Sequence, residues 1–402
     1  MAIVTPKLKL FEICGPGYVF NSRAPDNASE WIFGDPGLSD AVTGNQLIVV
    51  GNMPVLCSAG VATNSGLDLL REIGFNLEAQ IVTFTDEEDR LYRMKSLAEK
   101  GFSCIDQHAQ PDENLHPGTS WVGSSILSFL NNKSNLHQLV PSPYLPIRKS
   151  CDPSSLIRFA KQPERFPLVI KVATKNSSGS GRGIRACHNE SDLKQAQEFF
   201  GRCETVIVED FISMHNNLCL NYAIFPDGKI EYLGGSRQIV NDELNYLGNW
   251  LEPGAEPPSD LIKVGGEVMT RAWRLGYRGF AGFDAAVMDN GTFFIYDLNF
   301  RFNGSTTPIL IFDSLANRFG LPVAKFLAWN YTGGFIQMIA SLKKVAEKYC
   351  FIPFSTYDPA AWKKSSLKPR VSALLFGRTR DEVQLKEKEL HNLRFQSIQR
   401  DR

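Results

Sequence analysis

The stretch Gly279–Pro308, GFAGFDAAVMDNGTFFIYDLNFRFNGSTTP, is the part of the sequence from which the rest of the chain can be interpreted. Two apolar runs flank Asn290-Gly291, a dipeptide that favours a two-residue type I′ hairpin turn. With that turn, Asp284 lies directly opposite Asp297 on the paired strand. The two carboxylates then share one face of the sheet about 5 Å apart, where they repel each other unless a cation lies between them.

Asn299 and Arg301 follow Asp297 on the same face, because side chains in a strand alternate with a period of two. Two carboxylates and an amide oxygen form an all-oxygen set that suits Mg²⁺, with phosphate oxygens completing its coordination shell. The alternative is an edge hairpin whose aspartates only face water. Strands disfavour Asp, and the interleaved residues have a buried character that favours the cation site: Phe283, Ala285, Val287, Phe294, Ile295 and Tyr296.

Composition limits the classes of protein to consider. The chain has 402 residues with 43 basic and 43 acidic side chains, so its net charge gives no reason to expect a nucleic acid or a membrane as partner. Eight scattered cysteines without a CxxC pair indicate reduced thiols, and no segment approaches the roughly 18 apolar residues of a membrane span. We expect a cytoplasmic protein, and a homo-oligomer is compatible with the sequence.

The N-terminal part predicts alternating strands and helices. We expect an extended run at Leu8–Ile13, a buried strand at Leu47–Val50, helices at Ser65–Ile73 and Glu87–Glu99, and a strand between them at Ala79–Phe84. This order is typical of a parallel, Rossmann-like layer. No GxGxxG follows the first strand, and residues 1–45 receive no role.

A second set of signals lies on both sides of a proline-rich break. Lys133 opens a short helix ahead of Pro141, Pro143 and Pro146, where we place the first domain boundary; a solvated surface lysine is the alternative there. Lys171 lies inside the apolar strand Phe166–Val172 and therefore needs an anionic partner. The loop after it is rich in glycine and serine, residues that let backbone and hydroxyl donors approach a phosphate: Ser177, Ser178, Gly179 and Gly181.

The strand Thr205–Ile212 ends in an acidic pair. Such a strand end can offer backbone groups around Phe211 and Ile212 to an adenine edge, while Glu209 accepts from the exocyclic amine. A surface acid at a strand end is the alternative. Downstream, we expect helices at Ser259–Leu275, over an apolar region reaching Trp329, and at 336–348 and 380–393, with a strand at 371–376.

This order of lysine, strand lysine, Ser/Gly loop, acidic strand end and acidic hairpin resembles the ATP-grasp superfamily of carboxylate ligases. The match covers residues 132–308, and its most specific part is Asp297-x-Asn299-x-Arg301 preceded by Asp284. The resemblance implies two α+β subdomains that grip ATP behind a Rossmann-like N-terminal domain. Among these enzymes, the layout looks like the natural-product peptide ligases of the pheganomycin type, which implies a role in antibiotic biosynthesis. The implied divisions are 1–140, 141–335 and a small C-terminal subdomain, 336–402.

The resemblance also implies roles for individual residues. Lys133 and Lys171 contact ATP phosphates or adenine, the loop Ser177–Gly181 covers the β- and γ-phosphates, and Arg301 stabilises charge at the reacting groups. The remaining roles are adenine binding by Glu209, Phe211 and Ile212, and coordination of two Mg²⁺ (or Mn²⁺) by Asp284, Asp297 and Asn299.

Two positions depart from the family pattern. The second metal carboxylate is usually Glu, whereas Asp297 is one methylene shorter. An acid usually binds the ribose hydroxyls, whereas this chain offers Asn217.

The implied reaction is phosphorylation of a substrate carboxylate by ATP, followed by attack of a nucleophile on the acyl phosphate with release of phosphate and ADP. The implied partners are a small-molecule carboxylate and an amine of an amino acid or peptide. One alternative acceptor is the phosphopantetheine thiol or aminoacyl amine of an acyl carrier protein. Another alternative is a nucleotide-binding regulator without catalysis. Three segments are candidates for the walls of the substrate pocket: 51–54, 236–250 and 303–307.

Overall fold

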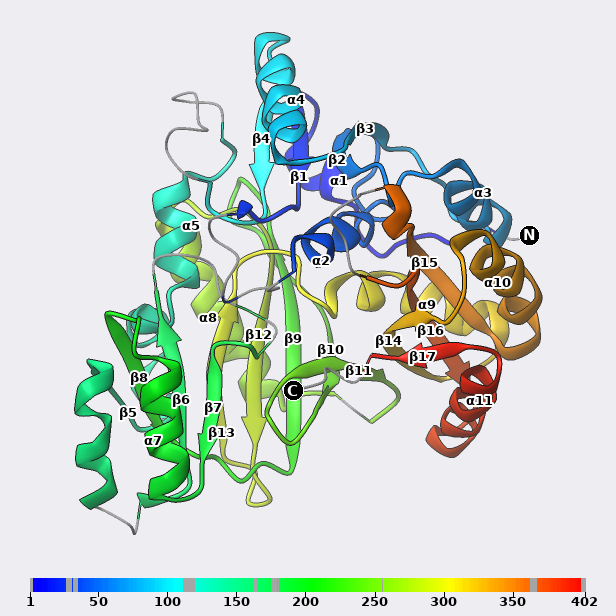
Figure 1. Ribbon diagram of the computed structural model, residues 1–402. Helices are drawn as coiled ribbons and strands as arrows, with labels where there is room; N and C mark the ends of the chain where they lie inside the picture. Colours follow the sequence, from blue (N-terminus) through cyan, green and yellow to red (C-terminus); the bar gives the residue numbers. More distant parts are fainter. Residues whose placement is uncertain are drawn as a thin grey trace.

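Three β-sheets organise the chain in the computed structural model (Figure 1). The structure describes residues 3–26, 31, 35–110, 120–161, 165–174, 179, 181–254, 256–361 and 367–398. A parallel four-stranded sheet belongs to the N-terminal part, an antiparallel four-stranded sheet follows it, and a nine-stranded sheet runs through the remainder. None of the helices in the described part is long and apolar enough to cross a bilayer.

The N-terminal sheet has the strand order β3-β2-β1-β4 and is parallel, which confirms the predicted Rossmann-like layer. Its elements are α1 (Leu10–Cys14), β1 (Tyr18–Asn21), α2 (Pro36–Ala41), η2 (Val42–Gly44), β2 (Pro54–Ser58), α3 (Asn64–Ile73), β3 (Gln80–Phe84), α4 (Glu87–Glu99) and β4 (Ser103–Asp106).

Two predictions in this part were wrong. The run Leu8–Ile13 is not an extended strand, because its last four residues belong to α1. Leu47–Val50 is buried but lies in a turn, and the strand begins only at Pro54. A short apolar run reports burial, and burial alone does not distinguish a strand from a packed turn.

Helices lead from this layer into the small antiparallel sheet, which has the order β5-β8-β6-β7 and packs one face against α7 (Figure 1). The connecting elements are α5 (Ser124–Asn131), η4 (Lys133–Asn135), α6 (Leu136–Leu139) and η5 (Ser142–Tyr144). The sheet and its helices comprise β5 (Arg148–Cys151), η6 (Pro153–Lys161), β6 (Leu168–Ala173), β7 (Ile184–Cys187), α7 (Glu190–Phe199) and β8 (Thr205–Asp210).

The nine-stranded sheet carries the acidic hairpin at one edge. Its first strands are β9 (Asn216–Ile224), β10 (Ile230–Val240) and β11 (Tyr246–Leu251), and α8 (Ser259–Arg274) precedes β12 (Gly279–Val287) and β13 (Phe293–Asn299). Alternate residues such as Leu220 and Phe283 pack under α8 in one hydrophobic core. The intervening residues of the same strands therefore face the other side of the sheet.

The hairpin turn differs from the prediction, although the pairing of the aspartates does not. Three residues, Asp289–Gly291, connect the strands, since Val287 pairs with Phe293 and Met288 N–H donates to Thr292 O. A β-bulge between Asp284 and Ala285 then accommodates Tyr296 as an extra residue and restores Asp284 opposite Asp297. The longer turn shifts the strand pairing by one residue, and the bulge shifts it back.

The C-terminal elements complete the nine-stranded sheet. They are α9 (Thr306–Phe319), β14 (Val323–Tyr331), α10 (Phe335–Tyr349), β15 (Phe351–Tyr357), η8 (Pro359–Ala361), β16 (Arg370–Gly377), α11 (Arg380–Asn392) and β17 (Phe395–Ser397). The predicted helix to Trp329 was wrong beyond Phe319, because 323–331 is a strand paired with β11, β16 and β17. The three-way domain division stays a prediction, although residues after 335 extend the same sheet that carries the hairpin.

Candidate active site

A cavity of about 760 Å³ lies where the three sheets meet. It gathers every predicted site residue that the structure describes: Lys133, Lys171, Gly179, Gly181, Glu209, Phe211, Ile212, Asn217, Asp284, Asp297, Asn299 and Arg301. Ser177 and Ser178 lie outside the described residues.

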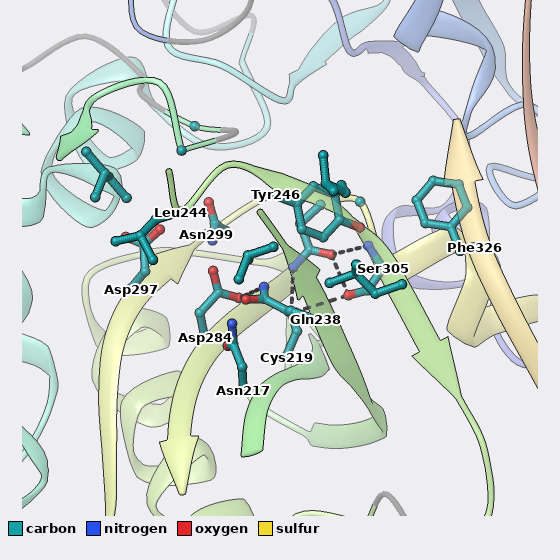
Figure 2. Close-up of a pocket in the computed structure, with 18 of the residues that line it drawn as sticks. Asn217, Cys219, Gln238, Leu244, Tyr246, Asp284, Asp297, Asn299, Ser305 and Phe326 are labelled. Carbon is teal, nitrogen blue, oxygen red and sulfur yellow. Dashed lines mark hydrogen bonds between the residues drawn. The ribbon is translucent and has the colours of Figure 1, made fainter. Parts of the chain in front are cut away.

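Asp284 and Asp297 face each other on β12 and β13 at the wall of this cavity (Figure 2). Lys133, which comes from the helical segment before the small sheet, forms an ion pair with Asp297. On the other side, Gln238 Nε2 donates to Asp284 Oδ1 at 2.8 Å. Lys133 is therefore not a solvated surface lysine, because only 9% of its side chain is exposed.

The two carboxylates have opposite pKa shifts. Burial and the neighbouring charge of Asp297 raise the pKa of Asp284 to about 7. Burial acts in the same direction on Asp297, but Lys133, Lys171 and Arg301 outweigh it and hold its pKa below the usual value. A carboxylate pair in which one member resists ionisation is suited to a cation that neutralises both.

The donor chemistry at this place fits Mg²⁺, since Asp284, Asp297 and Asn299 supply oxygen atoms to one cavity. Among the residues that the structure describes, no group of three or more His, Cys, Asp or Glu forms a metal cluster. A cation here would thus have two carboxylates and an amide from the protein. Mg²⁺ typically takes such a small set of protein ligands and fills its shell with phosphate and water.

Arg301 is fixed by two amide oxygens. Its Nη1 donates to Asn131 Oδ1 and its Nη2 to Asn299 Oδ1, both at 2.6 Å. Burial lowers the pKa of its guanidinium, against the attraction of Asp297 and Asp284. Asn299 therefore uses one lone pair on Arg301 and keeps a second for another ligand.

Lys171 has the anionic partner that its place in a strand requires. Its ammonium group forms an ion pair with Glu209 on the neighbouring strand β8 and donates to Tyr296 O at 3.1 Å. Arg148, which no sequence signal selects, lies 3.5 Å from Glu209. Glu209 is buried, and its Oε1 accepts no hydrogen bond from the described residues.

The backbone next to Glu209 offers fewer donors than the sequence suggests. Phe211 N–H donates to Pro167 O at 3.2 Å and is therefore occupied. Ile212 is the remaining member of the predicted adenine-binding pair and lines the cavity.

A polar chain joins the predicted ribose residue to the carboxylates. Tyr296 Oη donates to Asn217 Oδ1 at 2.6 Å and lies 3.2 Å from Gln238 Oε1, and Gln238 in turn donates to Asp284. Sequence reasoning missed Tyr296 because it counted as a buried residue of an alternating strand. The bulge turns the side chain of Tyr296 to the cavity side, and no pattern in the sequence predicts the bulge.

The two described glycines of the loop, Gly179 and Gly181, line the cavity, and Gly181 lies against the loop between β10 and β11. Gly179 N–H donates to Trp31 O, and a Cβ at Gly181 would lie 2.6 Å from Leu244 O. Gly181 has φ +78°, and Leu244 has φ +62°. The contact therefore requires glycine at 181, both for its backbone and for the space.

Two of the three expected wall segments line the cavity. They are 236–250, through residues such as Gln238 and Tyr246, and 303–307, through Asn303, Gly304 and Ser305 (Figure 2). The segment 51–54 does not, because Gly51 and Asn52 lie beside Lys9, Phe11 and Glu78.

Known structures share this architecture. N5-carboxyaminoimidazole synthetase from Staphylococcus aureus, complexed with ADP, has a TM-score of 0.59 at 11% identity and covers 98% of this chain and 99% of its own. The N5-carboxyaminoimidazole ribonucleotide synthetase of Thermus thermophilus has a TM-score of 0.58 at 13% identity, covering 93% and 98%. Biotin carboxylase from Campylobacter jejuni has a TM-score of 0.52 at 14% identity, covering 88% and 89%. At these identities the likeness concerns the fold.

Together with the matched sequence families, this fold and the residues gathered in the cavity define the class: the chain belongs to the ATP-grasp superfamily of carboxylate–amine ligases, which form ADP. Within that class, residues 146–299 match the model of the L-aspartate--L-methionine ligase ATP-grasp domain, and residues 9–128 match the model of that ligase's N-terminal domain. The closer likeness to pheganomycin-type ligases stays a prediction.

Proposed function

We propose that this protein activates the carboxylate of one amino acid as an acyl phosphate and joins it to the amine of a second amino acid. The observation that carries the proposal is the buried Asp284–Asp297 pair, placed in one cavity with Lys133, Lys171 and Arg301. The matched family models support L-aspartate and L-methionine as the first pair of substrates to examine.

The proposed roles follow from the contacts. Glu209, Ile212 and Asn217 surround the nucleoside, with Lys171 and the glycine loop over the phosphates. Asp284, Asp297 and Asn299 hold one or two Mg²⁺, a role that Mn²⁺ can share. When bound, the metal would neutralise phosphate charge.

Arg301 and Lys133 stabilise the charge that passes to the acyl phosphate. Both are largely removed from water, where electrostatic stabilisation is strongest. Gly181 lies against Leu244 and Asn245 at the cavity, and this contact helps to exclude water, which would otherwise hydrolyse the acyl phosphate.

Phosphate release from Mg·ATP tests the proposal, with the twenty amino acids supplied singly and in pairs and with mass spectrometry of the products. Release together with a new dipeptide supports it. Release only with a phosphopantetheinylated carrier protein would assign the enzyme to carrier loading instead. A lack of phosphate release under all of these conditions would contradict the proposal that the protein is a ligase of free amino acids.

A cytoplasmic location and a role in natural-product biosynthesis are part of the same proposal. The eight cysteines form no disulfide bonds with one another, as is usual for proteins of a reducing compartment.

A further inference from the structure

One wall of the cavity comes from the N-terminal layer and has no role in the site described so far. Beside Ala41, Val42 and Asn45, it contains Gln46, which follows η2, and Gln107 and His108, which follow β4. Gln107 and His108 lie at the carboxyl end of a parallel strand, the edge at which open α/β sheets bind ligands. We call Gln46, Gln107 and His108 the amide wall.

Polar atoms of the amide wall are buried without partners. Gln46 is 4% exposed and His108 2% exposed. Within the described residues, Gln46 Oε1, Gln107 Oε1 and both ring nitrogens of His108 make no hydrogen bond. A buried polar group without a partner costs about 1–3 kcal/mol, so four such atoms around one cavity indicate a ligand that supplies the partners.

A polar network behind the wall holds the backbone of His108 in place. Arg23, buried beyond the end of β1, donates to Asp40 of α2 at 2.6 Å and also forms an ion pair with Glu87. Arg90 is paired with Glu87, and Gln110, which lies 3.3 Å from Arg90, donates to His108 O at 3.0 Å. Such a supported wall is organised before a ligand arrives.

The loop of Gln46 also rests on the C-terminal sheet. A Cβ at Gly44 would lie 2.3 Å from Ser355 Oγ, and Ser355 and Thr356 of β15 line the same cavity. The amide wall is therefore part of a joint between the first and the last parts of the chain.

The unpartnered atoms are suited to N–H donors. The two amide oxygens accept. Burial and the charge of Arg301 hold the pKa of His108 well below the usual value, so its imidazole is neutral, with one ring nitrogen that accepts and one that carries the proton and donates. No carboxylate belongs to the wall. Among the described charged residues, Arg301 is the one whose charge acts on His108, which places the wall within electrostatic reach of the proposed reaction centre.

We infer that Gln46, Gln107 and His108 form the subsite for the primary amino group of the amine substrate. The inference rests on the proposed function and adds to it the place and chemistry of the nucleophile site. A carboxylate would hold the amine as a non-nucleophilic ammonium ion. Neutral acceptors next to a guanidinium bind the amine through its N–H groups and favour the uncharged form, which can attack.

Hydroxylamine separates this subsite from the activation step. It is a small nucleophile that converts an acyl phosphate into a hydroxamate and phosphate without a side chain to be held. Wild-type enzyme with Mg·ATP, hydroxylamine and either L-aspartate or L-methionine shows which carboxylate is activated. The other amino acid is then the amine, and its KM is measured through dipeptide formation.

Gln46→Met and Gln107→Met are expected to raise the KM for the amine about 10-fold, the effect of one lost hydrogen bond. The KM for ATP and the rate of hydroxamate formation should stay within about 2-fold, which also shows that the variants fold. His108→Asn should retain more of the amine affinity than His108→Phe. The matched controls are Gln138→Met and His137→Asn, at exposed positions outside the cavity.

A change of charge gives a result that altered packing alone would not. Gln46→Glu should lower the KM for the amine at pH 7, reduce kcat, and move the rise of kcat with pH upward by about one unit, because the new carboxylate stabilises the ammonium form.

Equal losses of hydroxamate and dipeptide in the Met variants would overturn the inference. So would a changed KM for the activated carboxylate with an unchanged KM for the amine. If wild-type enzyme forms no hydroxamate with any of the twenty amino acids, the proposed function fails, and the amine subsite fails with it.

Discussion

At the scale of single residues, the site depends on one pair of carboxylates whose environments differ. Lys133 binds Asp297, whereas Asp284 receives a hydrogen bond from the neutral Gln238. Asp297 is therefore the charged member of the pair at neutral pH, and Asp284 is the member that a cation would have to help ionise.

Asp297→Asn is expected to reduce the rate of dipeptide formation by at least ~10²-fold, because it removes one metal ligand and leaves Lys133 without its anion. The measurement is phosphate release with the amino-acid pair at saturating Mg·ATP. Asp289→Asn is the control, since Asp289 lies at the exposed tip of the same hairpin. Equal activity of the two variants would contradict the metal assignment.

The raised pKa of Asp284 also predicts that the stability of the protein depends on pH. Its folded-state pKa is about 7, whereas an aspartate in an unfolded chain titrates near 4, so between these values the folded state binds the extra proton. Its contribution to the free energy of unfolding therefore falls as the pH rises from about 4 to 7.

Thermal unfolding of the metal-free protein in EDTA measures this contribution. The wild-type Tm should fall, relative to that of Asp284→Asn, as the pH rises through that window, and Mg·ATP should recover more stability at about pH 8 than at about pH 5.5. Parallel Tm curves for the two proteins would contradict the raised pKa.

At the scale of elements, Gly181 lies against the loop 241–245 at the cavity. Gly181 and Gly254 share φ +78°, but only the Cβ at Gly181 would collide with a neighbour, whereas Gly254 has open space. Alanine substitutions at these two glycines therefore distinguish the effect of a steric collision from the effect of backbone strain.

Gly181→Ala is expected to raise the KM for ATP by roughly 10-fold, because the added Cβ collides with Leu244 and Asn245 and displaces residue 181 at the cavity. Gly254→Ala introduces the same backbone strain, roughly 1 kcal/mol, and should leave the KM unchanged. Steady-state kinetics with varied ATP measures both. A similar rise in both variants would show that strain, not the contact, is responsible.

At the scale of the whole molecule, one hydrophobic core joins the beginning and the end of the chain. It includes Val4 and Leu10 from the N-terminal part together with Val371 and Phe395 from the last strands. Residues so far apart in sequence should therefore unfold together.

Val371→Asp places a carboxylate in this core, where 1% of the native residue is exposed, and should cost several kcal/mol. We expect the variant to lose ATP binding along with its structure, although Val371 itself does not line the cavity. Leu385→Asp, at a position 59% exposed on α11, should shift the Tm by only a few degrees. Calorimetry that resolves a separate C-terminal transition would contradict a shared core.

The sequence alone determined those features that depend on neighbours along the chain. Helices such as α3 and α4 follow from their periodicity and caps, and the apolar strands around Lys171 and Asp284 follow from their composition. The motif order in 132–308 was enough to predict the superfamily. All these features depend on residues that are close together in the sequence, and local interactions determine them.

Only the tertiary structure decided which distant groups meet. The bulge at Tyr296, the turn at Leu47–Val50 and the strand at 323–331 depend on packing against partners far away in sequence. The amide wall likewise has no sequence motif. Gln46 and His108 become candidate ligand-binding residues only because the fold places them at a cavity that three sheets enclose. Side-chain burial and the absence of a hydrogen-bond partner are properties of the folded chain, and the spacing of residues in the sequence does not predict them.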